Sequence, residues 1–155
     1  MINLSVDDGA VSLCYGNFCL ENLLFHQTES KVSAILNWEL PILGHPLADL
    51  GFCCMPWHTL PNKYGGLWGC DLNELALPTE DNFIRRYMAL LNKVSTLLPF
   101  YTAFALYRFA VIFVGIADRA WEGNAADPRA KTLCTLAERF AVRGLEISKG
   151  VHHAI

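Results

Sequence analysis

The amino-terminal part of the chain alternates between apolar and polar positions over short stretches, which is typical of strands. Residues 11–14 are predicted to form a short strand that leads into a turn at Tyr15. Residues 22–25 and 31–37 are predicted to pair as a hairpin around the polar segment 27–30, because aliphatic and β-branched residues in the second strand alternate with polar ones. This part of the chain is therefore predicted to be a small β-structure.

Helical periodicity begins after the predicted hairpin. Pro46 fits the first position of a short helix over 46–54, because that position needs no backbone donor. Residues 60–78 are rich in Gly and Pro and are predicted to be irregular. Thr79 then caps a longer helix, whose positive first turn carries two acidic residues. Its apolar face is predicted to consist of Phe83, Ile84, Tyr87, Met88, Leu91 and Val94.

Two more helices complete the predicted pattern. One begins near Pro99 and ends before Gly123. The other begins at residues 127–128, where Asp is a cap and Pro opens the helix, and it ends at Gly150. Its buried positions are predicted to be Leu133, Leu136, Phe140 and Ile147. Three long helices following a small hairpin predict an α+β protein that is mainly α.

Composition narrows the class of protein. The chain has 155 residues, of which 53% are hydrophobic and 17% charged, so it can form one domain with a core. The net charge of -3 and the scattered basic residues predict no binding to nucleic acid. Six cysteines without a C-x-x-C pair predict reduced, structural thiols and a cytoplasmic location. The apolar run over 97–117 has Arg108 near its centre, which favours a buried helix over a membrane span.

Four motifs in the first fifty residues stand at a characteristic spacing. They are Tyr15-Gly16-Asn17, the single Asn22, Asn37-Trp38-Glu39 and Gly44-His45-Pro46-Leu47-Ala48-Asp49-Leu50. This frame resembles the catalytic loop of the aminoglycoside phosphotransferase and choline-kinase-like family, including the related domains attached to some acyl-CoA dehydrogenases. The family pattern reads His-Gly-Asp, Asn, Asp-Trp-Glu and Gly-Asp-Pro-x-x-Asp-Leu. The spacing is kept in this chain, whereas several acidic residues are replaced.

The resemblance implies a fold and a domain organisation. The fold would be the C-terminal lobe of a protein-kinase-like fold, with a short β-hairpin packed on a helical bundle. Residues 1–155 are predicted to be a single partial phosphotransferase-like domain. The nucleotide-binding N-terminal lobe is predicted to be absent, because only 14 residues precede Tyr15 and they contain no glycine-rich loop and no strand-borne lysine.

The resemblance also assigns roles to individual residues. Asn17 stands at the position of the family's catalytic Asp, Asn22 at that of a metal-binding Asn, and Asn37 at that of a metal-binding Asp. Tyr15 and Asp49 are predicted to support the loop. An amide cannot accept a proton, so base catalysis worth roughly 10²–10⁴-fold would be lost. Magnesium prefers carboxylates, so ATP and magnesium, the cofactors that the family implies, are predicted to bind weakly or not at all. Without the joint spacing, the asparagines would read as ordinary turn residues.

Three functions follow from these observations. The first is an inactive or severely impaired phosphotransferase-family lobe, that is, a pseudoenzyme that serves as a binding module or a remnant. The alternative is an ATP-dependent small-molecule kinase, which would phosphorylate an aminoglycoside-, choline- or hydroxyacyl-CoA-like hydroxyl with the N-terminal lobe supplied elsewhere. The third is an assembly protein. The predicted partner is accordingly a chain that bears the N-terminal lobe, or a second copy bound through an exposed apolar face, without membrane binding. Residues 60–81 and 104–121 are predicted to line any substrate pocket.

Arg108 is the residue in the long apolar helix that most needs an explanation. A fully buried arginine is costly without a partner, so Arg108 is predicted to pair with Asp49 or Glu39 and to support the loop. The alternative is an anion site for a substrate carboxylate or phosphate.

Overall fold

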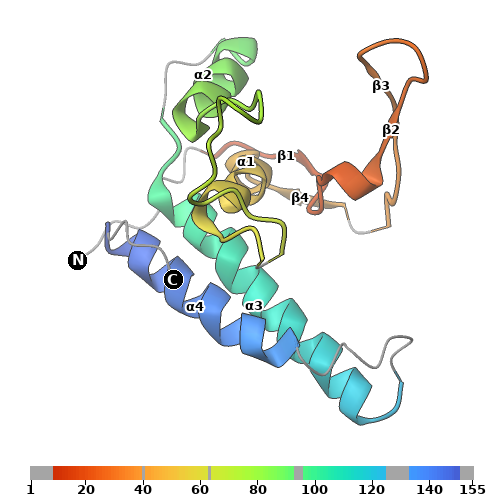
Figure 1. The fold of residues 1–155 in the computed structure, drawn as a ribbon, viewed down its shortest axis with the longest axis vertical. Coiled ribbons are helices and arrows are strands. Elements are labelled where there is room, and N and C mark those ends of the chain that lie inside the picture. The colour runs from red at the N-terminus through yellow and green to blue at the C-terminus, as the bar shows by residue number, and fades with distance from the viewer. Residues whose placement is uncertain (1–8, 40, 63, 93–95, 125–132, 151–155) are drawn as a thin grey trace.

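The computed structural model describes residues 9–39, 41–62, 64–92, 96–124 and 133–150 (Figure 1). These residues form mainly helices, preceded by short strands. The elements in chain order are β1 (Ser12–Cys14), the 3-10 turn η1 (Leu20–Asn22), β2 (Leu23–Phe25), β3 (Val32–Ile35), β4 (Ile42–Gly44), α1 (Leu47–Cys54), the 3-10 turn η2 (Met55–His58), α2 (Glu80–Leu90), α3 (Pro99–Trp121) and α4 (Cys134–Ser148). The predicted order of hairpin, short helix and three longer helices is confirmed.

The core lies between α3, α4 and α1 (Figure 1). Helix α3 contributes Leu106, Phe109 and Phe113, and the Phe113 ring packs on the Phe140 ring of α4 with 5.1 Å between the ring centroids. Two glycines allow the helices to approach one another closely. A Cβ on Gly51 of α1 would lie 2.5 Å from the Tyr101 backbone. A Cβ on Gly144 of α4 would lie 2.9 Å from the Ala103 carbonyl oxygen. Both contacts are too short for any larger residue, so these glycines set the spacing of the bundle.

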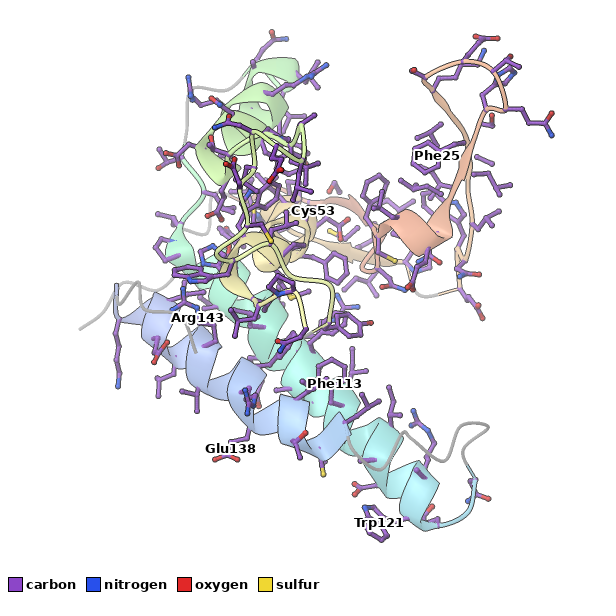
Figure 2. The ribbon with its side chains drawn as sticks, viewed as in Figure 1. Phe25, Cys53, Phe113, Trp121, Glu138 and Arg143 are labelled. Atoms are coloured by element: carbon purple, nitrogen blue, oxygen red, sulfur yellow. The ribbon has the colours of Figure 1, made fainter. Side chains whose placement is uncertain are left out.

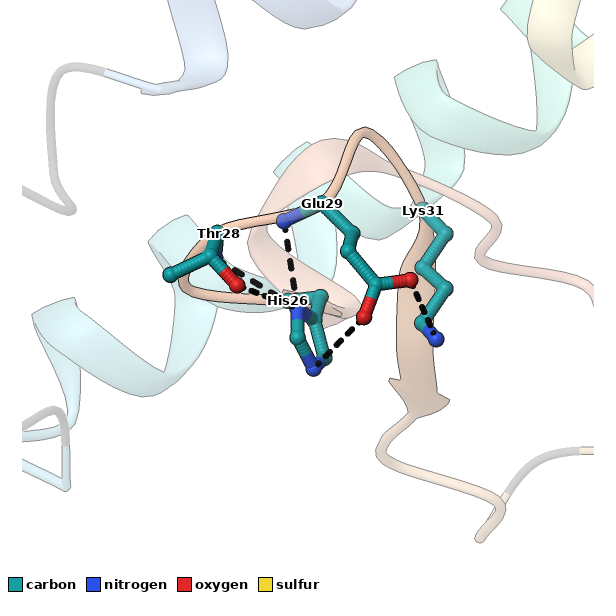
Figure 3. A network of polar contacts seen from close by, with 4 residues as sticks. All are labelled: His26, Thr28, Glu29 and Lys31. Atoms are coloured by element: carbon teal, nitrogen blue, oxygen red, sulfur yellow. Dashed lines mark hydrogen bonds and ion pairs between the residues drawn. The ribbon is translucent and has the colours of Figure 1, made fainter.

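The strands form two separate antiparallel pairs. β2 pairs with β3 as the predicted hairpin, which reaches out from the helices in Figure 1. Its tip is held by local bonds (Figure 3): the His26 Nδ1 accepts the Glu29 backbone N–H at 3.1 Å, and the Lys31 ammonium lies 2.8 Å from the Glu29 carboxylate. β1 pairs with β4, and Leu13 lies opposite Leu43. The sequence pattern did not predict β4, which lies between Pro41 and the Gly44-His45-Pro46 motif.

Helix α2 covers a second, smaller cluster. Thr79 caps this helix as predicted, since its side-chain oxygen accepts the Asn82 backbone N–H at 3.3 Å. Met88 packs with Leu50 and Cys54 of α1. Leu91, predicted on the apolar face, is 43% exposed, and Val94 lies outside the described residues. The described part of 60–78 contains turns and no helix or strand, as predicted.

The long apolar run forms α3, and half of its most apolar stretch is buried in the protein. By length and composition alone α3 could also cross a membrane, but its buried face carries the core of the bundle, which is the arrangement of a core helix. In α4, Phe140 and Ile147 are buried and Gly150 follows the helix in a left-handed conformation, as predicted. The predicted cap at residues 127–128 lies outside the described residues.

Candidate functional site

The segment that follows β1 is attached to α1 by one carboxylate. Asp49, in the first turn of α1, accepts the backbone N–H of Tyr15 at 2.6 Å and that of Gly16 at 2.8 Å. Gly16 has φ +81°, a left-handed conformation that glycine adopts without strain. Bonds from backbone donors to a charged acceptor are stronger than neutral ones, so Asp49 fixes the path of the turn. These are contacts through which a carboxylate can support a loop, the role that the sequence predicts for Asp49.

Tyr15 packs beneath this turn. Its hydroxyl donates to the Leu36 carbonyl oxygen, and its ring meets the Trp38 ring edge-on at 4.8 Å. His45 supports the other end of the frame, because its Nδ1 accepts the Leu47 backbone N–H at 3.2 Å and its ring stacks on Tyr101 at 5.0 Å. Tyr15 therefore joins the turn to the segment after β3, while His45 caps α1.

Three asparagines meet where the turn, η1 and the end of β3 converge. Asn22 is 4% exposed, and its Nδ2 donates to the Asn17 carbonyl oxygen at 2.9 Å. Its Oδ1 accepts the Asn37 Nδ2 at 2.5 Å. Asn37 itself has φ +56°, and this left-handed turn ends β3 and directs the side chain toward Asn22. The three residues that the sequence singled out are thus joined by side-chain amides, from Asn37 through Asn22 to Asn17.

A cavity of about 510 Å³ opens beside Asn17. Its described walls are mostly apolar, and among the described lining residues Glu21 alone is charged. Residues 60–81 contribute Tyr64 and Gly65, and no residue of 104–121 lines it. For this cavity the prediction is therefore wrong for the second segment, whose place in the wall is taken by residues of α1, η2 and α4. The lining residues are Asn17, Phe18, Cys19, Leu20, Glu21, Leu23, Phe52, Cys53, Met55, Pro56, Thr59, Tyr64, Gly65, Phe83 and Phe140.

Two cysteines face this cavity, and all six cysteines of the chain are free thiols. Burial raises the pKa of Cys53 to about 12, and the nearby Asp49 carboxylate acts in the same direction. Its thiol is therefore protonated at neutral pH and is a poor nucleophile. Cys53, labelled in Figure 2, is accordingly part of the apolar wall.

Among the arginines that the structure describes, the buried one is Arg143, which the sequence reasoning missed. Arg143 is 2% exposed; its Nε donates to the His58 carbonyl oxygen at 3.2 Å, and its Nη1 lies 3.1 Å from the Glu146 carboxylate. The guanidinium lies 4.7 Å from the centre of the Trp68 ring. His58 in turn bonds Glu80 at 2.8 Å. This group, the Arg143 cluster, joins α4 to η2, to the irregular segment and to the start of α2.

The prediction for Arg108 is wrong in its structural version. Arg108 is only half-buried, and among the described residues no ion pair joins it to Asp49 or Glu39. Asp49 is engaged by the backbone donors of Tyr15 and Gly16 instead. The physical reason is the helical phase: Phe104 and Tyr107 are also exposed, so position 108 borders the outer face of α3 and its side chain can extend toward water.

Comparison with known proteins identifies the family to which the four spaced motifs belong. The family model described as "Phosphotransferase enzyme family" matches residues 3–87, which is more than half of the chain. The chain belongs to this family.

Relatives and a solved structure agree with this assignment. Acyl-CoA dehydrogenase family member 10 of Mus musculus is 35% identical over 136 residues, covering 84% of this chain and 12% of that protein. Acyl-CoA dehydrogenase family member 11 of Gallus gallus is 34% identical over 155 residues, covering 95% and 20%. A Ralstonia eutropha structure described as an aminoglycoside phosphotransferase superposes with a TM-score of 0.84 at 36% identity, over 92% of this chain and 44% of that one. The chain thus spans a fifth or less of these curated relatives.

The family assignment confirms the predicted fold class, the C-terminal lobe of a kinase-like fold. Members of the family use ATP and magnesium, but the asparagine cluster does not fit a magnesium ion. The donor set at positions 17, 22 and 37 is neutral, and the one oxygen of the Asn22 side chain already accepts a hydrogen bond. Within the described residues no three His, Cys, Asp or Glu side chains gather as metal ligands.

Proposed function

We propose that this phosphotransferase-family chain is a catalytically silent binding module. The observation that carries the proposal is the asparagine cluster. Phosphoryl transfer requires a group that orients the attacking hydroxyl and metal ions that bridge the phosphates. Asn17 cannot accept the proton of a hydroxyl, and Asn22 and Asn37 offer amides that bond to each other.

The cavity beside Asn17 supports the binding part of the proposal. Its volume of about 510 Å³ suits a small molecule. Its wall, as far as the structure describes it, is built mainly from aromatic rings and thioether or thiol groups, with Glu21 as the single carboxylate. A polycation such as an aminoglycoside needs several carboxylates to replace its water. The cavity therefore favours a molecule with an apolar body and few positive charges.

The runner-up function is an active kinase whose remaining parts are supplied elsewhere. It is favoured by the intact positioning of the loop, since Asp49 holds the turn and Asn17 stands at the mouth of a cavity. In this alternative the hydroxyl acceptor would be aminoglycoside-, choline- or hydroxyacyl-CoA-like. In the binding module, phosphoryl transfer is lost because positions 17 and 37 carry no negative charge. In the kinase, transfer would proceed without that charge.

A transfer assay separates the two. Wild-type protein, the double variant Asn17→Asp with Asn37→Asp, and the matched control Asn92→Asp are incubated with γ-labelled ATP, magnesium and an aminoglycoside, choline or a hydroxyacyl-CoA. We expect no transfer above background from the wild type and the control. If the frame is otherwise competent, the double variant gains up to roughly 10²–10⁴-fold over them. Robust wild-type turnover would contradict the proposed function and favour the kinase.

Four predictions from the sequence go with this proposal. The chain acts as a single partial domain, it binds magnesium-ATP weakly or not at all, it works in the cytoplasm, and it associates with a lobe-bearing partner or a second copy. Exposed apolar side chains support an association. Leu13 and Leu43 are 61% and 77% exposed on the β1–β4 pair, and Trp121 is 68% exposed at the far end of α3 (Figure 2).

A further inference from the structure

The bond between Asn37 and Asn22 can form only because position 37 carries an amide. A carboxylate has no hydrogen to donate, so an acid at that position would place two acceptor oxygens where the structure has a donor and an acceptor 2.5 Å apart. Two such oxygens repel each other unless a proton or a cation lies between them. An acid at position 37 therefore loses this hydrogen bond, and a cation bound between the two oxygens would compensate for the loss.

The surroundings make this single bond important. Asn22 is 4% exposed, and its Nδ2 and backbone oxygen already bond to the Asn17 carbonyl oxygen and the Leu36 N–H, the second at 2.8 Å. The Asn37 amide satisfies the remaining oxygen of Asn22. Because the two residues are 15 positions apart, the bond also joins the end of β3 to η1.

We propose that Asn37 replaces a metal ion: its amide locks the loop without metal, and the change Asn37→Asp converts the lock into a divalent-cation site. The inference rests on the proposed function in taking Asn22 and Asn37 as the family's metal-ligand positions. In the variant, the introduced carboxylate and the Asn22 Oδ1 are the oxygen ligands from the protein. Asn37 is exposed, so a hydrated cation can reach this point.

The backbone makes the substitution selective. Asn37 has φ +56°, a conformation that Asn and Asp both tolerate, so Asn37→Asp changes the charge and the donor while the chain path is kept. Asn92 is a matched control. It has φ +53°, it is exposed, and its change to Asp adds the same charge away from the cluster. Asn37→Gly keeps the backbone conformation and removes the donor without adding a ligand.

The test measures thermal unfolding of these four proteins with magnesium or manganese alone, against EDTA and against sodium chloride of equal ionic strength. In EDTA we expect Asn37→Asp and Asn37→Gly to melt about 2–6 °C below wild type, because the Asn22 oxygen loses its donor. Metal is expected to restore the melting temperature of Asn37→Asp. Metal should have no effect beyond ionic strength on wild type, Asn37→Gly or Asn92→Asp.

Three results would overturn the inference: a metal-specific stabilisation of the wild type, an Asn37→Asp protein as stable as wild type in EDTA, or a destabilised Asn37→Asp protein that no metal restores. If the variants do not fold, the wild type still decides by NMR. Slow exchange of the Asn37 side-chain amide that magnesium leaves unchanged supports the lock, and fast exchange rejects it. The melts and spectra contain no nucleotide, so their outcome is independent of the transfer assay. Phosphoryl transfer by the wild type in that assay would contradict the proposed function, whereas the melts and spectra test the lock itself.

Discussion

The asparagine cluster and the Arg143 cluster are two polar groups of the same protein with opposite character. Asn17, Asn22 and Asn37 are neutral, and they meet at the surface end of a loop. The Arg143 cluster is charged and lies between α4 and the irregular segment, where Arg143 is 2% exposed. Charge is therefore present in the cluster that joins the helices and absent from the asparagine cluster of the loop.

The difference shows what each group contributes to stability. A buried guanidinium must have its donors satisfied, so the Arg143 cluster needs its partners around it in order to be tolerated at all. Amides carry no such charge penalty, and the asparagine cluster can be satisfied by local bonds within the loop. The first group ties four segments of the fold together, while the second fixes one loop.

The largest expected effect comes from Arg143→Met, which removes the charged centre of its cluster. The bond to the His58 carbonyl oxygen, the Glu146 ion pair and the contact with Trp68 are all lost. We expect the free energy of unfolding to fall by about 3 kcal/mol in urea denaturation. The matched control is Arg139→Met, since Arg139 is exposed on the same helix and should change stability by less than about 0.5 kcal/mol. Equal effects of the two would show that the cluster does not hold the helices.

Asp49→Asn has the next largest expected effect, and it tests whether charge still matters in the loop. The Asp49 carboxylate accepts from two backbone donors, and an amide would turn its NH₂ group toward one of them. We expect a loss of about 2 kcal/mol, measured by the same denaturation. Asp118→Asn, at an exposed position of α3, is the control. An unchanged stability of Asp49→Asn would mean that the turn keeps its path without that charge.

Arg108→Met has the smallest expected effect and sharpens the contrast between the two arginines. Because Arg108 is half-buried and forms no ion pair with Asp49 or Glu39 in the described structure, its removal should change the free energy of unfolding by no more than about 0.5 kcal/mol. Thermal melts beside Arg143→Met measure this. A loss as large as that of Arg143→Met would reinstate the ion pair, whereas no loss leaves the anion site as the prediction for Arg108.

The sequence by itself determined the helices, the β2–β3 hairpin and the spacing of the four motifs. Helical periodicity placed α2 and α3 correctly, and Thr79 marked the start of α2, because capping and amphipathic spacing are local properties. The motif spacing identified the asparagines before their contacts were known. Of the described residues in the predicted pocket segments, Tyr64 and Gly65 alone line the cavity, because a cavity wall is assembled from elements distant in the chain.

Only the tertiary structure decided which polar groups are buried and what they touch. Arg108 and Arg143 both lie in helices among apolar residues, and nothing local distinguishes them. Arg143 is buried because the irregular segment brings Trp68 over it, and Arg108 is not, because its side of α3 borders the outer face. The hydrogen bond between Asn37 and Asn22 likewise depends on a left-handed turn after β3 and on a contact across 15 residues. Periodicity shows which face of a helix is apolar. The residue that contacts this face from another element depends on how the whole chain packs.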